Sequence, residues 1–361
     1  MTIPSYFSGN YSEARAKFLA VCEKRSLAVE SFLNPKTKGA QGEDLYTDVA
    51  RIGPADAAKV LTLSSGTHGV EGYCGSGVQV GLLEENAFAD LPEDLSVVLI
   101  HAVNPYGFSH DRRVTEDNVD LNRNFVDFDT YVADDEGYAA IHPFILPADW
   151  DGPGREAADQ SLFGFIAEHG LTAFQAAVSG GQYRHPDGVF FGGQKPTWSR
   201  ETIIHILQSY AKQARLVGMI DFHTGLGPYG YGELITDGPP EMKALSKAWY
   251  GDEATDPAEG TSTSAVLTGT FGHGASEALP DAQIAFIALE YGTLDSQSVL
   301  QALRGDNWLY HRGAMNTDLS TTIKRDIRDA FYQDKDDWKE AIWTRANEVI
   351  GITLAKMKDA G

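Results

Sequence analysis

The sequence predicts a single α/β domain in which helices flank a twisted, mixed and largely parallel β-sheet. Short apolar runs of strand length alternate with stretches of helical periodicity, which is the pattern of βαβ units. Reactive residues directly follow several of these runs, and open α/β sheets bind ligands beyond the carboxyl ends of their strands. We therefore expect one domain over residues 1–361, with the helical part 294–361 packed on it.

The expected elements follow in chain order. Residues 11–33 carry apolar side chains at helical intervals, and Pro35 ends that pattern. From Trp338 onward, an apolar stripe marks a last helix. The polar stretch 110–125 is expected to be irregular. We expect strands at 45–52, 60–64, 95–103, 216–222, 231–236 and 284–290, helices at 77–86, 156–168 and 201–216, and a strand within the glycine-rich segment 178–193.

Composition excludes two classes of partner. The chain has 29 basic and 51 acidic residues, a formal net charge of −22, so nucleic acid and anionic membranes would be repelled. Its two cysteines form no disulfide framework, and the N-terminus has no charged segment followed by an apolar one. No apolar run reaches about 18 residues. We expect a cytoplasmic protein, and no feature of the sequence specifies an oligomeric state.

The first candidate site follows the apolar run 60–64. His68 and Glu71 lie three residues apart in a glycine-rich turn that leads to a helix. Imidazole and carboxylate both suit zinc, and a catalytic zinc site needs three protein ligands and an open position for water. A chain with ten histidines also contains such a spacing by chance. Here the position at the end of a buried strand favours the metal site, which needs a third ligand from elsewhere.

His223 supplies that third ligand. It follows the apolar run 216–222, so it is expected at the same edge of the sheet as His68 and Glu71. By strand alternation, Asp221 lies on the same side as His223. Asp221 is therefore either a carboxylate that orients the histidine or simply a strand-end carboxylate.

At this point the sequence resembles the zinc carboxypeptidase family of metallopeptidases, the M14 type, and within it the branch called DUF2817. The resemblance covers about residues 61–293, and its motifs occur in family order. Those motifs are His68-Gly-Val-Glu71, Asn104-Pro105-Tyr106-Gly107 with Arg112-Arg113, Asp120-Leu121-Asn122-Arg123-Asn124-Phe125, Asp221-Phe222-His223-Thr224-Gly225 and Glu290-Tyr291-Gly292-Thr293.

The resemblance implies a zinc carboxypeptidase-like fold and one zinc ion per chain, bound by His68, Glu71 and His223. It also implies that Asn122 and Arg123 grip a substrate carboxylate. This second role agrees with physical chemistry, because a guanidinium fork binds a carboxylate through two hydrogen bonds.

Catalytic roles also follow from the resemblance. Glu290 matches the glutamate that takes a proton from the attacking water and returns it to the leaving amine. Either Arg112 or Arg113 matches the arginine that polarises the scissile carbonyl, and we prefer Arg113, with Arg112 as a substrate-binding residue. Apart from the resemblance, the two arginines could be a surface ion pair and Glu290 a carboxylate at the edge of the core.

This chain departs from the family at two places. None of Tyr229, Tyr231 and Tyr291 clearly matches the mobile tyrosine, and Tyr106 stands where peptidases have aspartate. The resemblance as a whole still implies a carboxypeptidase-like enzyme that acts on small peptides. Because of these departures, an N-acyl amino acid amidohydrolase is the alternative. A third hypothesis, from another class, is an inactive carboxylate-binding protein.

Other motifs are weaker. The run 225–230 fits G-x-G-x-x-G, but Pro228 argues against the helix that a dinucleotide site needs. Ser76 lacks a nucleophile elbow. We expect Cys74 to be a buried thiol. His273, flanked by glycines, could lie at the rim of the pocket.

Overall fold

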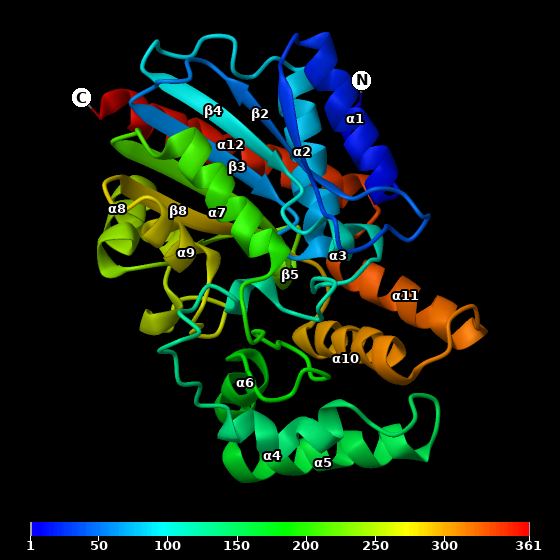
Figure 1. The fold of residues 1–361 in the computed structure, drawn as a ribbon. Helices are drawn as coiled ribbons and strands as arrows, with labels where there is room; N and C mark the ends of the chain where they lie inside the picture. The colour runs from blue at the N-terminus through cyan, green and yellow to red at the C-terminus, as the bar shows by residue number, and fades with distance from the viewer. Residues whose placement is uncertain (1, 361) are drawn as a thin grey trace.

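Eight strands form one mixed sheet within residues 2–360, which are the residues that the computed structural model describes (Figure 1). The strand order is β1-β2-β4-β3-β5-β8-β6-β7. The central strands β4, β3, β5 and β8 are parallel, whereas β2 and β6 run antiparallel to β4 and β8. The predicted α/β domain with a largely parallel sheet is confirmed. The strands are β1 (Val29–Leu33), β2 (Tyr46–Ile52), β3 (Lys59–Ser65), β4 (Leu95–His101), β5 (Leu216–Tyr229), β6 (Gly232–Thr236), β7 (Ala254–Thr255) and β8 (Gln283–Gly292).

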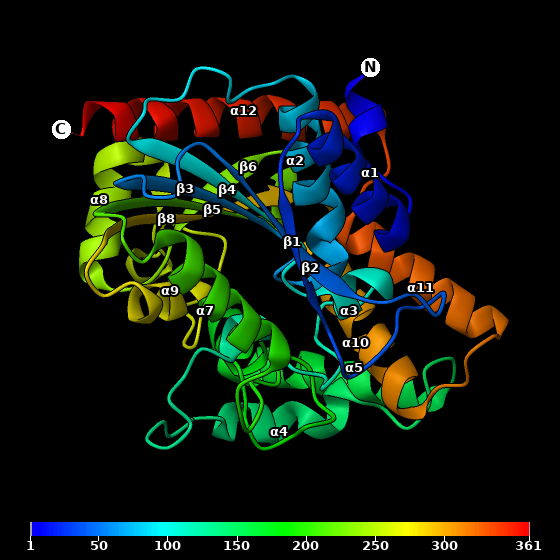
Figure 2. The same cartoon turned by 45° about the horizontal axis from the view of Figure 1, so that its top comes forward.

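Helices cover both faces of this sheet, as Figure 2 shows. Helices α1, α2 and α12 pack on one face, and α7 and α9 on the other. The helices are α1 (Tyr11–Lys24), α2 (Gly72–Glu84), α3 (Pro105–Ser109), α4 (Glu136–Ile145), α5 (Pro153–His169), α6 (Leu171–Ser179), α7 (Trp198–Ala211), α8 (Pro240–Tyr250), α9 (Phe271–Ala278), α10 (Ser296–Arg312), α11 (Asp318–Phe331) and α12 (Asp336–Asp359). Short 3-10 turns include η2 (Gly69–Glu71) and η3 (Leu121–Arg123).

Strand β3 is buried along its whole length because both of its faces are covered. Leu61 and Leu63 belong to the core beneath α1, α2 and α12, whereas Val60 belongs to the core beneath α7 and α9. Successive side chains of a strand point to opposite faces. A continuous apolar run is therefore what a central parallel strand requires.

A third group of helices lies beyond the strand ends. Helices α4, α5 and α6 form a layer below the sheet in Figure 1, with α10 and α11 between them and the strands. These helices share a separate core, which includes Ile141, Leu303 and Ile327. Val70, between His68 and Glu71, belongs to the same core. This layer therefore adjoins the turn that carries the candidate metal ligands.

The N-terminal prediction was wrong in its second half. Helix α1 ends at Lys24, and Val29–Leu33 form the edge strand β1. Ser26 has a φ of 56°, a left-handed backbone that ends a helix. Antiparallel pairing of β1 with β2 then overrides the helical spacing of Val29 and Phe32.

The segment 178–193 contains no strand in the described structure, only a single bridge between Gln182 and Phe191. Helices α3, α4, α6, α8 and α9 were not predicted. Helix α2 begins at Gly72, five residues earlier than expected. The predicted stripe from Trp338 onward is confirmed, since Trp338 is buried and its Nε1 donates to the Gly292 carbonyl at 3.0 Å.

None of the helices described between residues 2 and 360 combines the length and the apolar character needed to cross a membrane.

Gly75 lets α2 approach the sheet closely. A Cβ at this position would lie 2.7 Å from the Ser65 Cβ and 2.8 Å from the Phe222 Cβ. We therefore expect Gly75→Ala to lower the free energy of unfolding by about 1–3 kcal/mol, the usual cost of overpacking. Gly351→Ala is the control, because a Cβ there meets no atom within 4 Å and should stabilise α12 by up to about 1 kcal/mol. Urea unfolding of both variants measures this; equal effects of the same sign would contradict the prediction.

Candidate metal centre

Two neighbouring strands bring the three predicted ligands together. Strand β3 ends at Ser65, and the chain then turns through His68 into η2, which ends at Glu71. His223 lies on β5, which pairs with β3 in parallel, with Ser65 opposite Phe222. Because the two strands end at the same edge of the sheet, the three side chains meet there.

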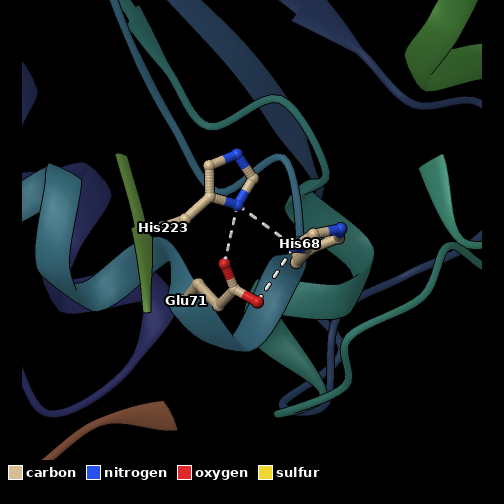
Figure 3. Close-up of side chains that lie close together, drawn as sticks. All are labelled: His68, Glu71 and His223. Carbon is tan, nitrogen blue, oxygen red and sulfur yellow. Dashed lines mark hydrogen bonds and ion pairs between the residues drawn. The ribbon is translucent and has the colours of Figure 1, made fainter. Parts of the chain in front are cut away.

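The three side chains form one buried cluster (Figure 3). Glu71 bridges the histidines, with Oε1 2.9 Å from the His68 Nδ1 and Oε2 2.9 Å from the His223 Nδ1. The two Nδ1 atoms are 3.2 Å apart. Ligand atoms around tetrahedral zinc, with bonds of about 2.0–2.2 Å, are separated by roughly 3.3–3.5 Å. The residues therefore fit a zinc ion after small shifts.

A carboxylate lies behind each histidine. The Nε2 of His68 is 3.2 Å from the Asp120 Oδ1, and the Nε2 of His223 is 2.6 Å from the Asp221 Oδ2. When the His223 Nε2 donates its proton to Asp221, the Nδ1 lone pair faces the centre of the cluster, which is the arrangement that metal-binding histidines use. The His68 Nε2 is nearer to the Arg113 Nη2, at 2.8 Å, than to Asp120, and a guanidinium can only donate. Of the two roles left open for Asp221, the contact supports the orienting one.

Asp120 was not singled out as a site residue from the sequence. Its only sequence signal was its place at the start of the string 120–125. Ser64 and Thr67 hold Asp221 in turn, because their hydroxyls donate to its Oδ1 at 2.6 and 2.9 Å.

Electrostatics favours the charged form of Glu71 and Asp120. Burial by itself raises the pKa of Glu71, but the charge of His68 and the hydrogen bond from His223 outweigh it and hold that pKa well below its usual range. Burial likewise opposes ionisation of Asp120, and the charge of Arg113 reverses the effect, so the pKa of Asp120 is lowered. Ionised carboxylates are the form that binds a cation.

Arg113 points into this cluster and Arg112 points away from it. The Nε of Arg113 donates to the Asp120 Oδ2 at 2.9 Å, and Nη1 donates to the Glu71 Oε1 at 3.0 Å. Arg112 is buried elsewhere, where its Nε donates to the Asp306 Oδ2 at 2.8 Å and its guanidinium stacks over Tyr310. The structure thus brings Arg113, and not Arg112, to the triad.

Asn122 and Arg123 lie close by, and the side chain of each already bonds to other protein groups. Arg123 is 2% exposed and donates to the carbonyls of Ser179 and Asn122. The Asn122 Oδ1 accepts a hydrogen bond from the Phe271 amide at 2.8 Å. Binding of a further carboxylate to Arg123 therefore requires release of the Ser179 contact.

Glu290 lies on β8 directly opposite His223 on β5. Its Oε1 accepts a hydrogen bond from the Leu226 amide at 2.9 Å, and its side chain is almost fully buried. Burial and the neighbouring Glu71 charge raise the pKa of Glu290 to about 8. A carboxyl group with a raised pKa beside a metal triad is a typical proton carrier in hydrolases.

Two other residues considered from the sequence lie outside the triad. Burial raises the pKa of the Cys74 thiol well above its usual value, which agrees with the expected buried thiol. His273 lies on α9, two residues after Phe271, whose amide donates to Asn122. Its Nδ1 lies 2.8 Å from the Thr270 hydroxyl.

The chain resembles several solved structures weakly. Carboxypeptidase A from Helicoverpa armigera is 14% identical, with 89% of this chain and 74% of that chain covered and a TM-score of 0.44. An aspartoacylase family protein from Mesorhizobium loti is 12% identical, with 81% and 68% covered and a TM-score of 0.37. A murein-tripeptide amidase from Escherichia coli O157 is 14% identical, with 82% and 92% covered and a TM-score of 0.33. These likenesses are too weak to assign an activity.

No protein of curated function matches this sequence. A family model described as "Protein of unknown function (DUF2817)" matches residues 7–345. Because this match spans most of the chain, the protein belongs to the DUF2817 family.

Proposed function

We propose that this protein is a zinc-dependent hydrolase that cleaves an amide bond next to a free carboxylate, as carboxypeptidase-like metallopeptidases of the M14 type do. The observation that carries the proposal is the buried triad His68, Glu71 and His223, whose ligand atoms face one another. A zinc ion held there would act as a Lewis acid and would lower the pKa of a bound water, so that hydroxide is available to attack a carbonyl.

In this proposal, Glu290 moves the proton. It takes a proton from the attacking water and delivers it to the leaving amine. The negative charge of Glu71 contributes to the raised pKa of Glu290. A cation held by Glu71 would offset that charge, and Glu290 would then ionise more readily and accept the proton near neutral pH.

Arg113 stabilises the oxyanion in the same scheme. Its Nε donates to the Asp120 Oδ2, and this contact anchors the guanidinium beside the triad. Nη1 and Nη2, which lie 3.0 Å from the Glu71 Oε1 and 2.8 Å from the His68 Nε2, are the groups that would donate to developing negative charge. We assign the substrate carboxylate to Asn122 and Arg123, after release of the Ser179 contact.

The substrate class is tested with a panel of zinc-loaded reactions. We expect hydrolysis of N-acylated dipeptides with a free C-terminus, and none of the same peptides with an amidated C-terminus. If the protein hydrolyses only N-acyl amino acids and none of the peptides, it is a deacylase and not a peptidase. No hydrolysis of any of these compounds by zinc-loaded protein would contradict the proposed function.

Removal of one ligand should remove one zinc ion. We expect His68→Ala to contain about one equivalent of zinc less than the wild type, because two remaining ligands hold zinc weakly. His273→Ala is the matched control, since this histidine lies outside the triad. Elemental analysis after dialysis measures both. If His68→Ala keeps the wild-type zinc content, the triad is not a metal site.

Substitution of the proton carrier should separate chemistry from metal binding. Glu290→Gln keeps the shape of the side chain, so we expect wild-type zinc content and a kcat lower by a factor of about 10²–10⁴. Steady-state kinetics with the substrate found in the panel measures this effect. An unchanged kcat would remove Glu290 from the mechanism.

The two adjacent arginines should respond differently. We expect Arg113→Gln to lower kcat by a factor of about 10²–10³, as the loss of an oxyanion donor does. Arg112→Gln breaks a buried ion pair with Asp306 and should cost about 3–5 kcal/mol of stability, with activity per folded molecule largely kept. Steady-state kinetics and chemical denaturation of both variants measure these effects. A large loss of kcat in Arg112→Gln, with kcat kept in Arg113→Gln, would assign the catalytic role to Arg112.

A further inference from the structure

A second group of potential metal ligands lies outside the catalytic triad. His142 on α4 and His185 and Asp187 in the turn that follows residue 181 each offer a ligand atom, and these atoms lie within 4.8 Å of one another. Helix α4 belongs to the layer below the sheet in Figure 1. The proposed hydrolase mechanism uses none of these three residues.

The geometry of this group is close to that of a metal site. The His142 Nε2 lies 3.3 Å from the Asp187 Oδ1, and the two imidazole rings are stacked with centroids 4.0 Å apart. Neighbouring ligand atoms around tetrahedral zinc are also roughly 3.3–3.5 Å apart. One pair of ligands is therefore already at the required spacing. The stacked His185 ring must turn to face the same ion, because the lone pair of an imidazole nitrogen lies in the plane of its ring.

Side-chain hydrogen bonds hold the backbone of the turn that carries His185 and Asp187. The Gln182 side chain accepts from the His185 amide and donates to the His185 carbonyl, both at 2.8 Å. Asn307 on α10 donates to the Asp187 carbonyl at 2.8 Å. Because the backbone is fixed by these contacts, the two side chains are positioned without having to bond to each other.

The side chains themselves are not committed to ordinary partners. Within residues 2–360, the buried Nδ1 of His142 has no hydrogen-bond partner, which is rare for a buried polar atom and requires an explanation. In the same part of the chain, no lysine or arginine lies within 4.0 Å of the Asp187 carboxylate, whose ion-pair contact there is His142. A proton on Nδ1 leaves the His142 Nε2 lone pair, together with the Asp187 carboxylate, available to a cation.

We propose that His142, His185 and Asp187 form a second binding site, for a divalent transition metal such as zinc. Two imidazoles and one carboxylate suit zinc and its neighbours, whereas magnesium and calcium prefer oxygen ligands alone. The Asp187 side chain is 46% exposed, so water completes the coordination. This site is independent of the proposed function.

Metal at this site would fasten the turn to α4 beside the catalytic arginines. The chain leaves the turn through Val189, whose amide donates to the Tyr138 hydroxyl of α4 at 2.8 Å. Phe190 follows, and its ring lies below the guanidinium groups of both Arg113 and Arg123. The second metal therefore stiffens the wall against which these arginines pack.

Zinc titration of purified, metal-stripped protein tests the proposal. We expect the wild type to bind two equivalents, His142→Ala one, His68→Ala one and the double variant none. In the His68→Ala protein, zinc should still raise the melting temperature, because a ligand that binds only the folded state stabilises it. Should the catalytic triad bind no metal, the wild type would bind one equivalent and His142→Ala none, so the two proposals fail separately.

Two further variants guard against misfolding and unspecific binding. Asp187→Asn keeps the size of a half-exposed side chain, so it should fold and bind the second zinc at least tenfold more weakly. His169→Ala removes an exposed histidine of the same helical layer and should bind as the wild type does. If Asp187→Asn and His142→Ala bind as many equivalents as the wild type, with the same affinity, the second site does not exist.

Discussion

The parallel pairing of β3 with β5 is the constraint on which the candidate metal centre depends. It sets Ser65 opposite Phe222, so the turn with His68 and the strand position of His223 reach the same edge of the sheet. The pairing of β5 with β8 then adds Glu290 directly beside His223. A slip of one residue in either pairing would turn these side chains to opposite faces. The buried apolar faces of the strands fix the register, and the register in turn fixes the site.

Charge balance explains how so many ionisable groups stay buried together. Glu71, Asp120 and Asp221 are all nearly inaccessible to water, and an unpaired buried carboxylate would be costly. Arg113 contacts two of them, and the histidines contact all three. The site therefore has a local basic side chain although the whole chain carries a net charge of −22. The negative global charge opposes polyanionic partners, whereas the local arginine suits a group with a single negative charge.

The adjacent arginines show why residue type alone does not assign a role. Arg112 and Arg113 have the same chemistry and follow the same turn, yet one pairs with Asp306 of α10 and the other with Asp120 and Glu71. Asp306 is 194 residues away from Arg112 in the chain. A local sequence pattern cannot predict a contact over that separation, so only the tertiary structure distinguishes the roles of the two arginines.

The sequence by itself determined the class of the sheet and its central strands, because strand periodicity is a local property. It also singled out His68, Glu71 and His223, which the structure brings together. It did not determine that residues 29–33 leave the helical pattern, or that Asp120 supports His68 from behind. Antiparallel pairing decided the first and a contact across 52 residues decided the second. The tertiary structure also brought His142 of α4 to His185 and Asp187. Such contacts depend on packing between distant segments of the chain, which the local spacing of residues does not predict.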